Sequence, residues 1–151
     1  MSTYLATIRW TKDDGDFLKG RYSRQHSIAF DGGIEIAGSS SAHTVPLPYS
    51  VEAAVDPEEL FVASISTCHM LWFLDFAKRA GIVVEAYEDA AEGAMEPDDL
   101  GRLVIAVVTL RPLVKLANPG QSGQLDHLHH QAHRACFIAN SVKSDVRIKP
   151  R

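Results

Sequence analysis

The feature that most constrains the fold is one long apolar stretch, DPEELFVASISTCHMLWFLDFAKRAG, at residues 56–81. Asp56 is a typical N-cap, Pro57 suits the first helical position, and a glutamate follows where it completes a capping box. Gly81 ends the helix that this pattern predicts. Apolar side chains cover nearly every face of that helix, so we expect a central helix that is buried almost all round.

Extended segments stand on both sides of this helix in the sequence. Tight-turn signals, above all the step from Asp31 to Gly32, predict hairpins among them. The expected strands are residues 4–11, 21–30, 34–37, 82–95, 102–116 and 144–149, with an irregular loop at 38–56 and a second helix at 122–139. This order has no regular βαβ repeat, which favours an α+β fold.

Length and charge restrict the class of protein. A chain of 151 residues is expected to form one domain, residues 1–151, with a core of its own. The net charge of -4, without a stripe of lysine and arginine, argues against a nucleic-acid partner. Asp75 and Lys78 interrupt the most apolar stretch, so no membrane span is expected. Residues 1–14 lack the pattern of a signal peptide, which favours the cytoplasm.

Two cysteines, Cys68 and Cys136, are too few and too far apart for a disulfide scaffold or a CxxC motif. A buried free cysteine most often packs as a small hydrophobe, and composition alone favours that interpretation for both. A metal site is the alternative, because His129, His133 and Cys136 follow one another at helical spacing. The spacing permits a metal without identifying one, and we favour a polar helix face. The sequence assigns no role to the histidines of this segment, which are His127, His129, His130 and His133.

A reactive Cys68 would need help from outside its own helix. The thiolate is the reactive form of a cysteine, and an apolar helix disfavours that charge unless a cation is close by. Cys68 lies about three turns from the helix start, beyond the reach of the helix dipole. The segment KGRYSRQH offers Arg21 and Arg24, and Glu58 is a candidate to orient one of them. His69 points about 100° away from Cys68, so we expect a packed histidine rather than a base.

Glu58 itself is ten residues from Cys68 in the sequence. On one helix this separates the two backbones by about 15 Å, which excludes a direct contact. Glu58 would therefore serve the thiol only through the long arm of an arginine, or from the helix of a second subunit. The simpler interpretation is that Glu58 provides favourable negative charge at a helix N-terminus.

Several motifs follow one another along essentially the whole chain. They are RQH and FDGG in the first hairpins, DPEELFVASISTCHMLWFL on the long helix, and ACFIANS at the second helix. In this order, and with this spacing of Glu58 to Cys68, they resemble the OsmC/Ohr family, thiol peroxidases that act on organic hydroperoxides. His69 and Met70 stand where phenylalanine is commoner in the family, and HTVPLPYS replaces a glycine-rich loop. The resemblance is thus to a less-studied OsmC-like branch.

The resemblance implies a role for each candidate residue. The peroxidatic cysteine falls on Cys68, the resolving cysteine on Cys136 and the motif glutamate on Glu58. The catalytic arginine falls on Arg24, with Arg21 as the alternative. The implied reaction reduces an organic hydroperoxide, joins the two cysteines in a disulfide, and reopens it with a dithiol reductant of the lipoyl or thioredoxin type, without a metal or organic cofactor. The apolar pocket expected to favour organic peroxides is lined by Leu60, Phe61, Met70 and Phe73.

The resemblance also implies a homodimer. In the family fold, strands of both chains form mixed sheets wrapped around two long central helices, and the two active sites lie at the interface. The helix predicted at residues 56–81 has no polar face, and an intertwined α+β dimer would cover it on all sides. Two other functions remain open: an OsmC-like binding protein for a small ligand without peroxidase activity, or a metal binder that uses His129, His133 and Cys136.

Overall fold

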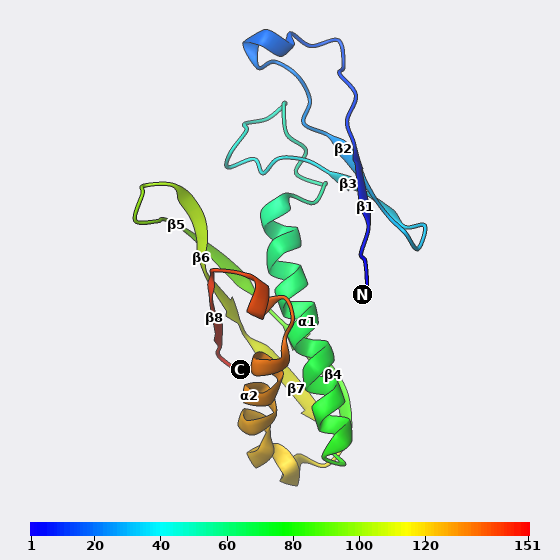
Figure 1. Cartoon of the computed structure of the whole chain (residues 1–151), viewed down its shortest axis with the longest axis vertical. Coiled ribbons are helices and arrows are strands. Elements are labelled where there is room, and N and C mark those ends of the chain that lie inside the picture. The colour runs from blue at the N-terminus through cyan, green and yellow to red at the C-terminus, as the bar shows by residue number, and fades with distance from the viewer. The chain divides into compact units, whose positions relative to one another are not determined.

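The computed structural model describes all residues from Met1 to Arg151 (Figure 1). The chain divides into two compact units, Met1–Leu60 and Phe61–Arg151. Each unit has its own sheet structure, and the two are described separately.

The first unit is built on a three-stranded antiparallel sheet with the order β1-β2-β3. Its strands are β1 (Ala6–Arg9), β2 (His26–Phe30) and β3 (Glu35–Gly38). The predicted hairpin at Asp31-Gly32 is present, and Gly33 closes it with a φ of 90°, a conformation that glycine adopts without steric cost. Both hairpins expected in the first third of the sequence are therefore confirmed.

Residues 21–25 differ from the expectation, because strand β2 begins only at His26. Residues 21–25 form no strand, and only Arg21 makes an isolated bridge, to Asp16. A 3-10 turn, η1 (Phe17–Lys19), is followed by Gly20 with a φ of 71°. The loop after β3 is irregular, as predicted, and touches the sheet through a bridge between Gly38 and Val55.

The predicted long helix is α1 (Pro57–Arg79). Its capping box is formed as expected: Glu59 N–H donates to Asp56 Oδ1 at 2.7 Å, and Asp56 N–H donates to Glu59 Oε2 at 3.1 Å. Burial differs from the expectation, since a single chain buries only one stripe of α1. The buried residues are Ile65, His69, Phe73 and Ala77, each four positions from the next. Other apolar positions stay open, and Leu71 is 57% exposed.

By length and composition alone, α1 also meets the criteria for a membrane-crossing helix, with a mean hydropathy of 1.5 over 18 residues. The expectation that Asp75 and Lys78 rule this out is therefore too strict. Core helices of soluble proteins have the same composition, and the buried stripe of α1 packs against strands and a second helix. Composition by itself is weak evidence for a membrane location.

The second unit contains two sheets. Their strands are β4 (Val84–Asp89), β5 (Glu92–Pro97), β6 (Leu103–Leu110), β7 (Pro112–Leu116) and β8 (Asp145–Ile148). Strand β4 pairs with β7, and the other sheet has the order β5-β6-β8, in which β8 runs parallel to β6. The two extended runs predicted at 82–95 and 102–116 pair with each other in antiparallel fashion, β5 with β6 and β4 with β7. The pairing is interrupted where β4 passes into β5 and β6 into β7.

The second predicted helix is shorter than expected. It consists of α2 (Leu125–Ala135), preceded by a 3-10 segment, η2 (Pro119–Gln124), and followed by η3 (Ala139–Ser141). The Asn118 side chain accepts a hydrogen bond from Gly120 N–H and holds the 3-10 turn. Cys136 ends α2 because its backbone is extended, with φ -64° and ψ 110°.

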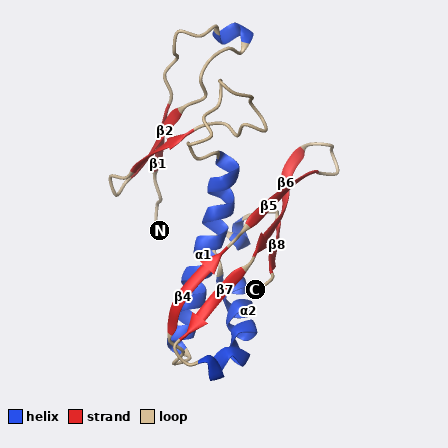
Figure 2. Cartoon of the chain, turned by 180° about the vertical axis from the view of Figure 1, so that it is seen from behind, coloured by secondary structure: helices blue, strands red, loops and turns tan.

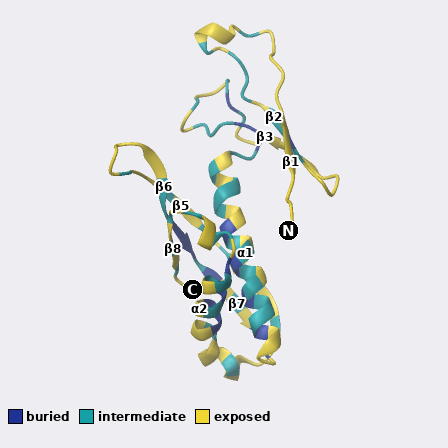
Figure 3. Cartoon of the chain, viewed as in Figure 1, coloured by how far each residue is buried: buried dark blue, intermediate teal, exposed yellow.

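The second unit has two layers, with α1 and α2 together on one side of the strands (Figure 2). Its main core lies between these layers, and its buried members are Phe73, Ala77, Ile82, Leu116, Leu128 and Ala132. A second cluster centres on Ile65, Val108 and Leu110, where β6 meets α1 (Figure 3). Since the cores bind α1 to α2 and to the sheets, residues on the facing sides of these two helices are held in fixed positions.

Candidate active site

The second unit brings the two cysteine thiols together. Cys68 lies half-buried on α1, and Cys136 is fully buried at the end of α2. Burial, followed by the hydrogen bond and charge of the neighbouring Cys68, raises the pKa of the Cys136 thiol to about 11. The two residues are 68 positions apart in the sequence, and only the packing of α2 on α1 makes them neighbours.

Local structure fixes the orientation of the Cys136 side chain. The helix stops at this residue, and the chain turns into η3, so that Ala139 N–H donates to Cys136 Sγ at 3.4 Å. On the other side, Phe137 meets Trp72 of α1 edge-on, with ring centroids 5.3 Å apart. Trp72 stands four residues after Cys68 on the same face of α1. The thiol pair thus lies beside an aromatic contact between the two helices.

The predicted arginine is engaged within its own loop. Arg24 Nη1 donates to the carbonyl oxygens of Gly20 at 2.8 Å and Tyr22 at 2.6 Å, and the guanidinium stacks 3.7 Å above the Tyr22 ring. Backbone groups also hold Arg24, whose N–H donates to the Tyr49 carbonyl at 2.9 Å. Arg21, the alternative, is exposed and makes only a backbone bridge to Asp16 in this loop. Arg24 is therefore the better ordered of the two arginines.

Glu58 forms neither the predicted ion pair with Arg24 nor any other hydrogen bond. Its side chain is half-buried, and the capping box at the first turn of α1 is formed by Asp56 and Glu59. Glu58 thus takes no part in capping the helix, and its carboxylate remains available for a hydrogen bond or an ion pair with another group. The spacing argument that Glu58 cannot reach Cys68 along one helix holds, because both residues lie on the continuous α1.

The predicted apolar pocket is not formed as one set of residues. Phe73 is fully buried in the main core, against Tyr87 of β4 and His129 of α2. Phe61 packs instead on the second cluster around Ile65. The prediction was wrong for Phe73, because the four-residue stripe turns its side chain into the core.

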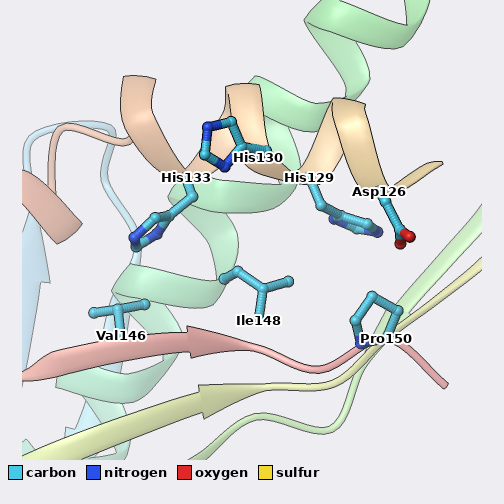
Figure 4. Close-up of a pocket in the computed structure, with 7 residues that line it drawn as sticks. All are labelled: Asp126, His129, His130, His133, Val146, Ile148 and Pro150. Atoms are coloured by element: carbon cyan, nitrogen blue, oxygen red, sulfur yellow. The ribbon is translucent and has the colours of Figure 1, made fainter. Parts of the chain in front are cut away.

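The histidines of α2 separate into different environments. A shallow pocket of about 350 Å³ lies between α2 and β8 (Figure 4). It is lined by Asp126, His129, His130, His133, Val146, Ile148 and Pro150. His129 and His133 reach toward β8, whereas the ring of His130 points away from it. No three histidine, cysteine or acidic side chains come close enough together to hold a metal ion. The alternative site of His129, His133 and Cys136 is therefore not assembled.

A buried histidine pair joins the two helices that carry the thiols. His69 Nε2 lies 3.1 Å from His129 Nδ1, and the two rings are nearly parallel, with 9° between their planes. Burial lowers the pKa of His69 to about 3 and that of His129 to about 4, so both imidazoles are neutral at neutral pH. His69 is packed, as predicted, but its partner was not foreseen. The available signal was the four-residue stripe that places His69 between Ile65 and Phe73.

The arrangement defines an α+β protein with a closely placed dithiol at the junction of two helices. A family model described as OsmC-like protein matches residues 50–151. The chain belongs to the OsmC-like family.

Solved structures agree with this assignment. An OsmC-like protein of unknown function from Vibrio cholerae is 44% identical, with both chains covered completely and a TM-score of 0.96. The organic hydroperoxide resistance protein OhrB of Bacillus subtilis is 20% identical, with 99% of this chain and 98% of that chain covered and a TM-score of 0.68. An OsmC-like protein from Mycoplasma pneumoniae is 11% identical, covering 99% and 96%, with a TM-score of 0.74. The last two show the shared fold alone. No curated protein matches this chain.

Proposed function

We propose that this protein is a thiol-dependent peroxidase that reduces organic hydroperoxides. The adjacency of Cys68 and Cys136 in the interior of the second unit carries the proposal. Membership of the OsmC-like family supports it, as does a shared fold with organic hydroperoxide resistance proteins of Bacillus subtilis and Legionella pneumophila.

The two thiols have different roles in this reaction. Cys136 is fully buried and its raised pKa, about 11, keeps it protonated at neutral pH, which makes it a poor nucleophile. Cys68, which is half-buried, is therefore the peroxidatic residue. Its thiolate attacks the O–O bond, the alcohol leaves, and Cys68 becomes a sulfenic acid. Cys136 then displaces water from the sulfenic acid to form a disulfide, and an external dithiol of the lipoyl or thioredoxin type reduces it.

Arg24 is the proposed activator of Cys68. A guanidinium stays charged in a partly dry site, where it stabilises the thiolate and the developing alkoxide. The contacts of Arg24 with two carbonyls and the Tyr22 ring order the side chain without neutralising its charge. Glu58, whose carboxylate has no partner in its own unit, is the proposed group that orients the arginine in the assembled site.

A homodimer is the proposed assembly, with residues 1–151 as one OsmC-like domain in the cytoplasm. The single chain leaves large apolar side chains open on elements of the second unit: Leu71 is 57%, Leu103 70% and Phe137 66% exposed. Apolar surface of this kind marks an interaction site. A second copy that covers α1 would restore the all-round burial that its composition demands.

Stopped-flow mixing of the reduced protein with an alkyl hydroperoxide, and separately with hydrogen peroxide, tests the proposal. We expect faster reaction with the alkyl hydroperoxide. Cys68→Ser should abolish consumption, and Cys136→Ser should retain one rapid turnover and accumulate a sulfenic acid. Unchanged consumption in Cys68→Ser would refute the mechanism. No consumption by the wild type would point instead to a ligand-binding OsmC-like protein.

A further inference from the structure

The His69–His129 contact is a buried polar link between the two helices that carry the thiols. The 3.1 Å distance from His69 Nε2 to His129 Nδ1 is that of a hydrogen bond in which one ring donates and the other accepts. His69 is 1% exposed and His129 is 3% exposed. Phe73 stacks on His129 with ring centroids 4.3 Å apart, which limits how far that ring can move.

Both histidines are close to the cysteines along the chain. On α1, His69 directly follows Cys68. Cys136 directly follows the last residue of α2 and comes seven residues after His129, which corresponds to a distance of about 10 Å along the helix axis. Rotation or sliding of either helix would therefore break the imidazole hydrogen bond and separate the sulfurs together.

Apart from the contact of the two thiols themselves, the other contacts between the helices are apolar and less directional. Trp72 and Phe137 touch edge-on with centroids 5.3 Å apart, and Ala77 and Ala132 are buried in the main core. A hydrogen bond fixes one geometry more sharply than such contacts, because a misplaced buried polar nitrogen loses its partner outright. The other ring nitrogens of the pair, His69 Nδ1 and His129 Nε2, have no partner, so this single bond carries the polar specificity of the contact.

We propose that the His69–His129 hydrogen bond is a positioning contact that holds Cys68 and Cys136 at the separation needed for a disulfide. The inference deepens the proposed function, because it concerns the disulfide step of that reaction. His69 and His129 touch neither peroxide nor reductant in this role. They act through the helices, by raising the effective concentration of one thiol at the other.

The redox equilibrium of the thiol pair tests this without any peroxide. Oxidised dithiothreitol takes two electrons and two protons from Cys68 and Cys136, which become a disulfide while the reagent becomes a dithiol. The equilibrium ratio of disulfide to dithiol protein, at known concentrations of oxidised and reduced dithiothreitol, gives the effective concentration of one thiol at the other. We expect His69→Leu to lower it about tenfold, equivalent to a reduction potential about 30 mV less negative.

Rescue variants distinguish positioning from a general loss of stability. In His69→Gln the amide reaches about as far as Nε2, and in His129→Asn about as far as Nδ1, so each preserves a hydrogen bond to the remaining imidazole. Both should keep the potential near the wild-type value. His130→Asn is the matched control on α2, because the His130 ring points away from β8 (Figure 4). Val108→Ala, which weakens the second core cluster, controls for lower stability.

The outcomes are separable. A wild-type potential in folded His69→Leu would overturn the inference, and so would an equal shift in Val108→Ala. If His69→Leu fails to fold, failure of His69→Gln and His129→Asn to retain the potential overturns it. Absence of a Cys68–Cys136 disulfide in the oxidised wild type overturns it as well. A wild type that forms the disulfide but ignores peroxides would refute the proposed function and leave the positioning contact in place.

Discussion

The thiol pair and the arginine loop are built in contrasting ways. Cys68 and Cys136 are neighbours because α1 and α2 pack on a common core within the unit Phe61–Arg151. Arg24 belongs to the unit Met1–Leu60, where carbonyl oxygens and the Tyr22 ring hold it. In the proposed reaction, disulfide formation depends on the packing of the second unit alone, whereas activation of Cys68 is assigned to a residue of the first unit. Variants can break one function and leave the other.

The largest expected effect concerns the core that creates the thiol pair. Phe73→Ala removes a fully buried ring from the main cluster and should cost about 3 to 5 kcal/mol of unfolding free energy. Phe30→Ala, in the first unit, removes a ring that is 40% exposed and should cost less than half as much. Denaturant unfolding of both variants measures the difference. Equal losses would contradict the assignment of the main core to the second unit.

The next effect separates activation from disulfide formation. Arg24→Ala should lower the rate constant for an alkyl hydroperoxide by about 10²- to 10³-fold, the usual cost of losing one group that stabilises developing charge. Arg24→Lys should recover only part of the rate, because lysine lacks the planar fork of arginine. The Cys68–Cys136 potential should stay unchanged in both. Arg21→Ala is the matched control, and a loss there in place of Arg24→Ala would transfer the role to Arg21.

A pH effect should follow from the histidine pair. Folding lowers the pKa of His69 and His129 from 6.5 to about 3 and about 4, by burial first. The charges of His129 and then His133 lower the pKa of His69 further, while Asp126 and Asp89 partly offset the shift at His129. Below about pH 6.5 the unfolded chain binds more protons than the folded one. The free energy of unfolding therefore decreases as the pH is lowered.

When the pH is lowered from about 7 to about 5.5, the two histidines together should reduce the free energy of unfolding by roughly 2 to 3 kcal/mol. Denaturant unfolding of the reduced protein at both pH values measures the loss. His69→Gln removes one of the two titrating groups and should roughly halve it. A pH-independent free energy in the wild type over this range would show that the histidines titrate normally in the folded protein.

The smallest effect concerns the start of α1. Asp56→Ala removes one half of the capping box and should cost about 1 kcal/mol of unfolding free energy. Glu58→Gln should leave stability nearly unchanged, because Asp56 and Glu59 form the capping box without it, while slowing the reaction with peroxide if Glu58 orients Arg24. Thermal melting should detect the loss of stability in Asp56→Ala, and peroxide kinetics should detect the slower reaction of Glu58→Gln. A loss of stability in Glu58→Gln would return that residue to a purely structural role.

Local patterns in the sequence were sufficient for most elements. The cap at Asp56, the glycine at 81 and the turn at Asp31-Gly32 each depend on neighbouring residues, so they predicted α1 and the second hairpin correctly. The failures have local physical causes as well. The 3-10 turn before α2 and the extended Cys136 shorten the second helix, and the Gly20 turn delays β2.

The candidate site was predictable only in part. Resemblance to the OsmC/Ohr family identified Cys68 and Cys136 as a pair, and the structure makes them neighbours. The partner of His69 was not predictable, because the 60-residue separation between His69 and His129 is closed only by helix packing. The expected pocket role of Phe73 was wrong for a related reason: composition shows that a helix is apolar, but not which stripe a single chain buries.

The sequence by itself determined the order of most helices and strands, that the chain is α+β, and that its two cysteines are Cys68 and Cys136. Those properties depend on residue type and short-range spacing. The tertiary structure decided that the thiols meet, that Cys136 keeps its proton, and that a neutral imidazole pair joins their helices. Each of these depends on burial and on atoms brought within a few ångströms from distant parts of the chain, where loss of water changes both proton affinity and the strength of a hydrogen bond.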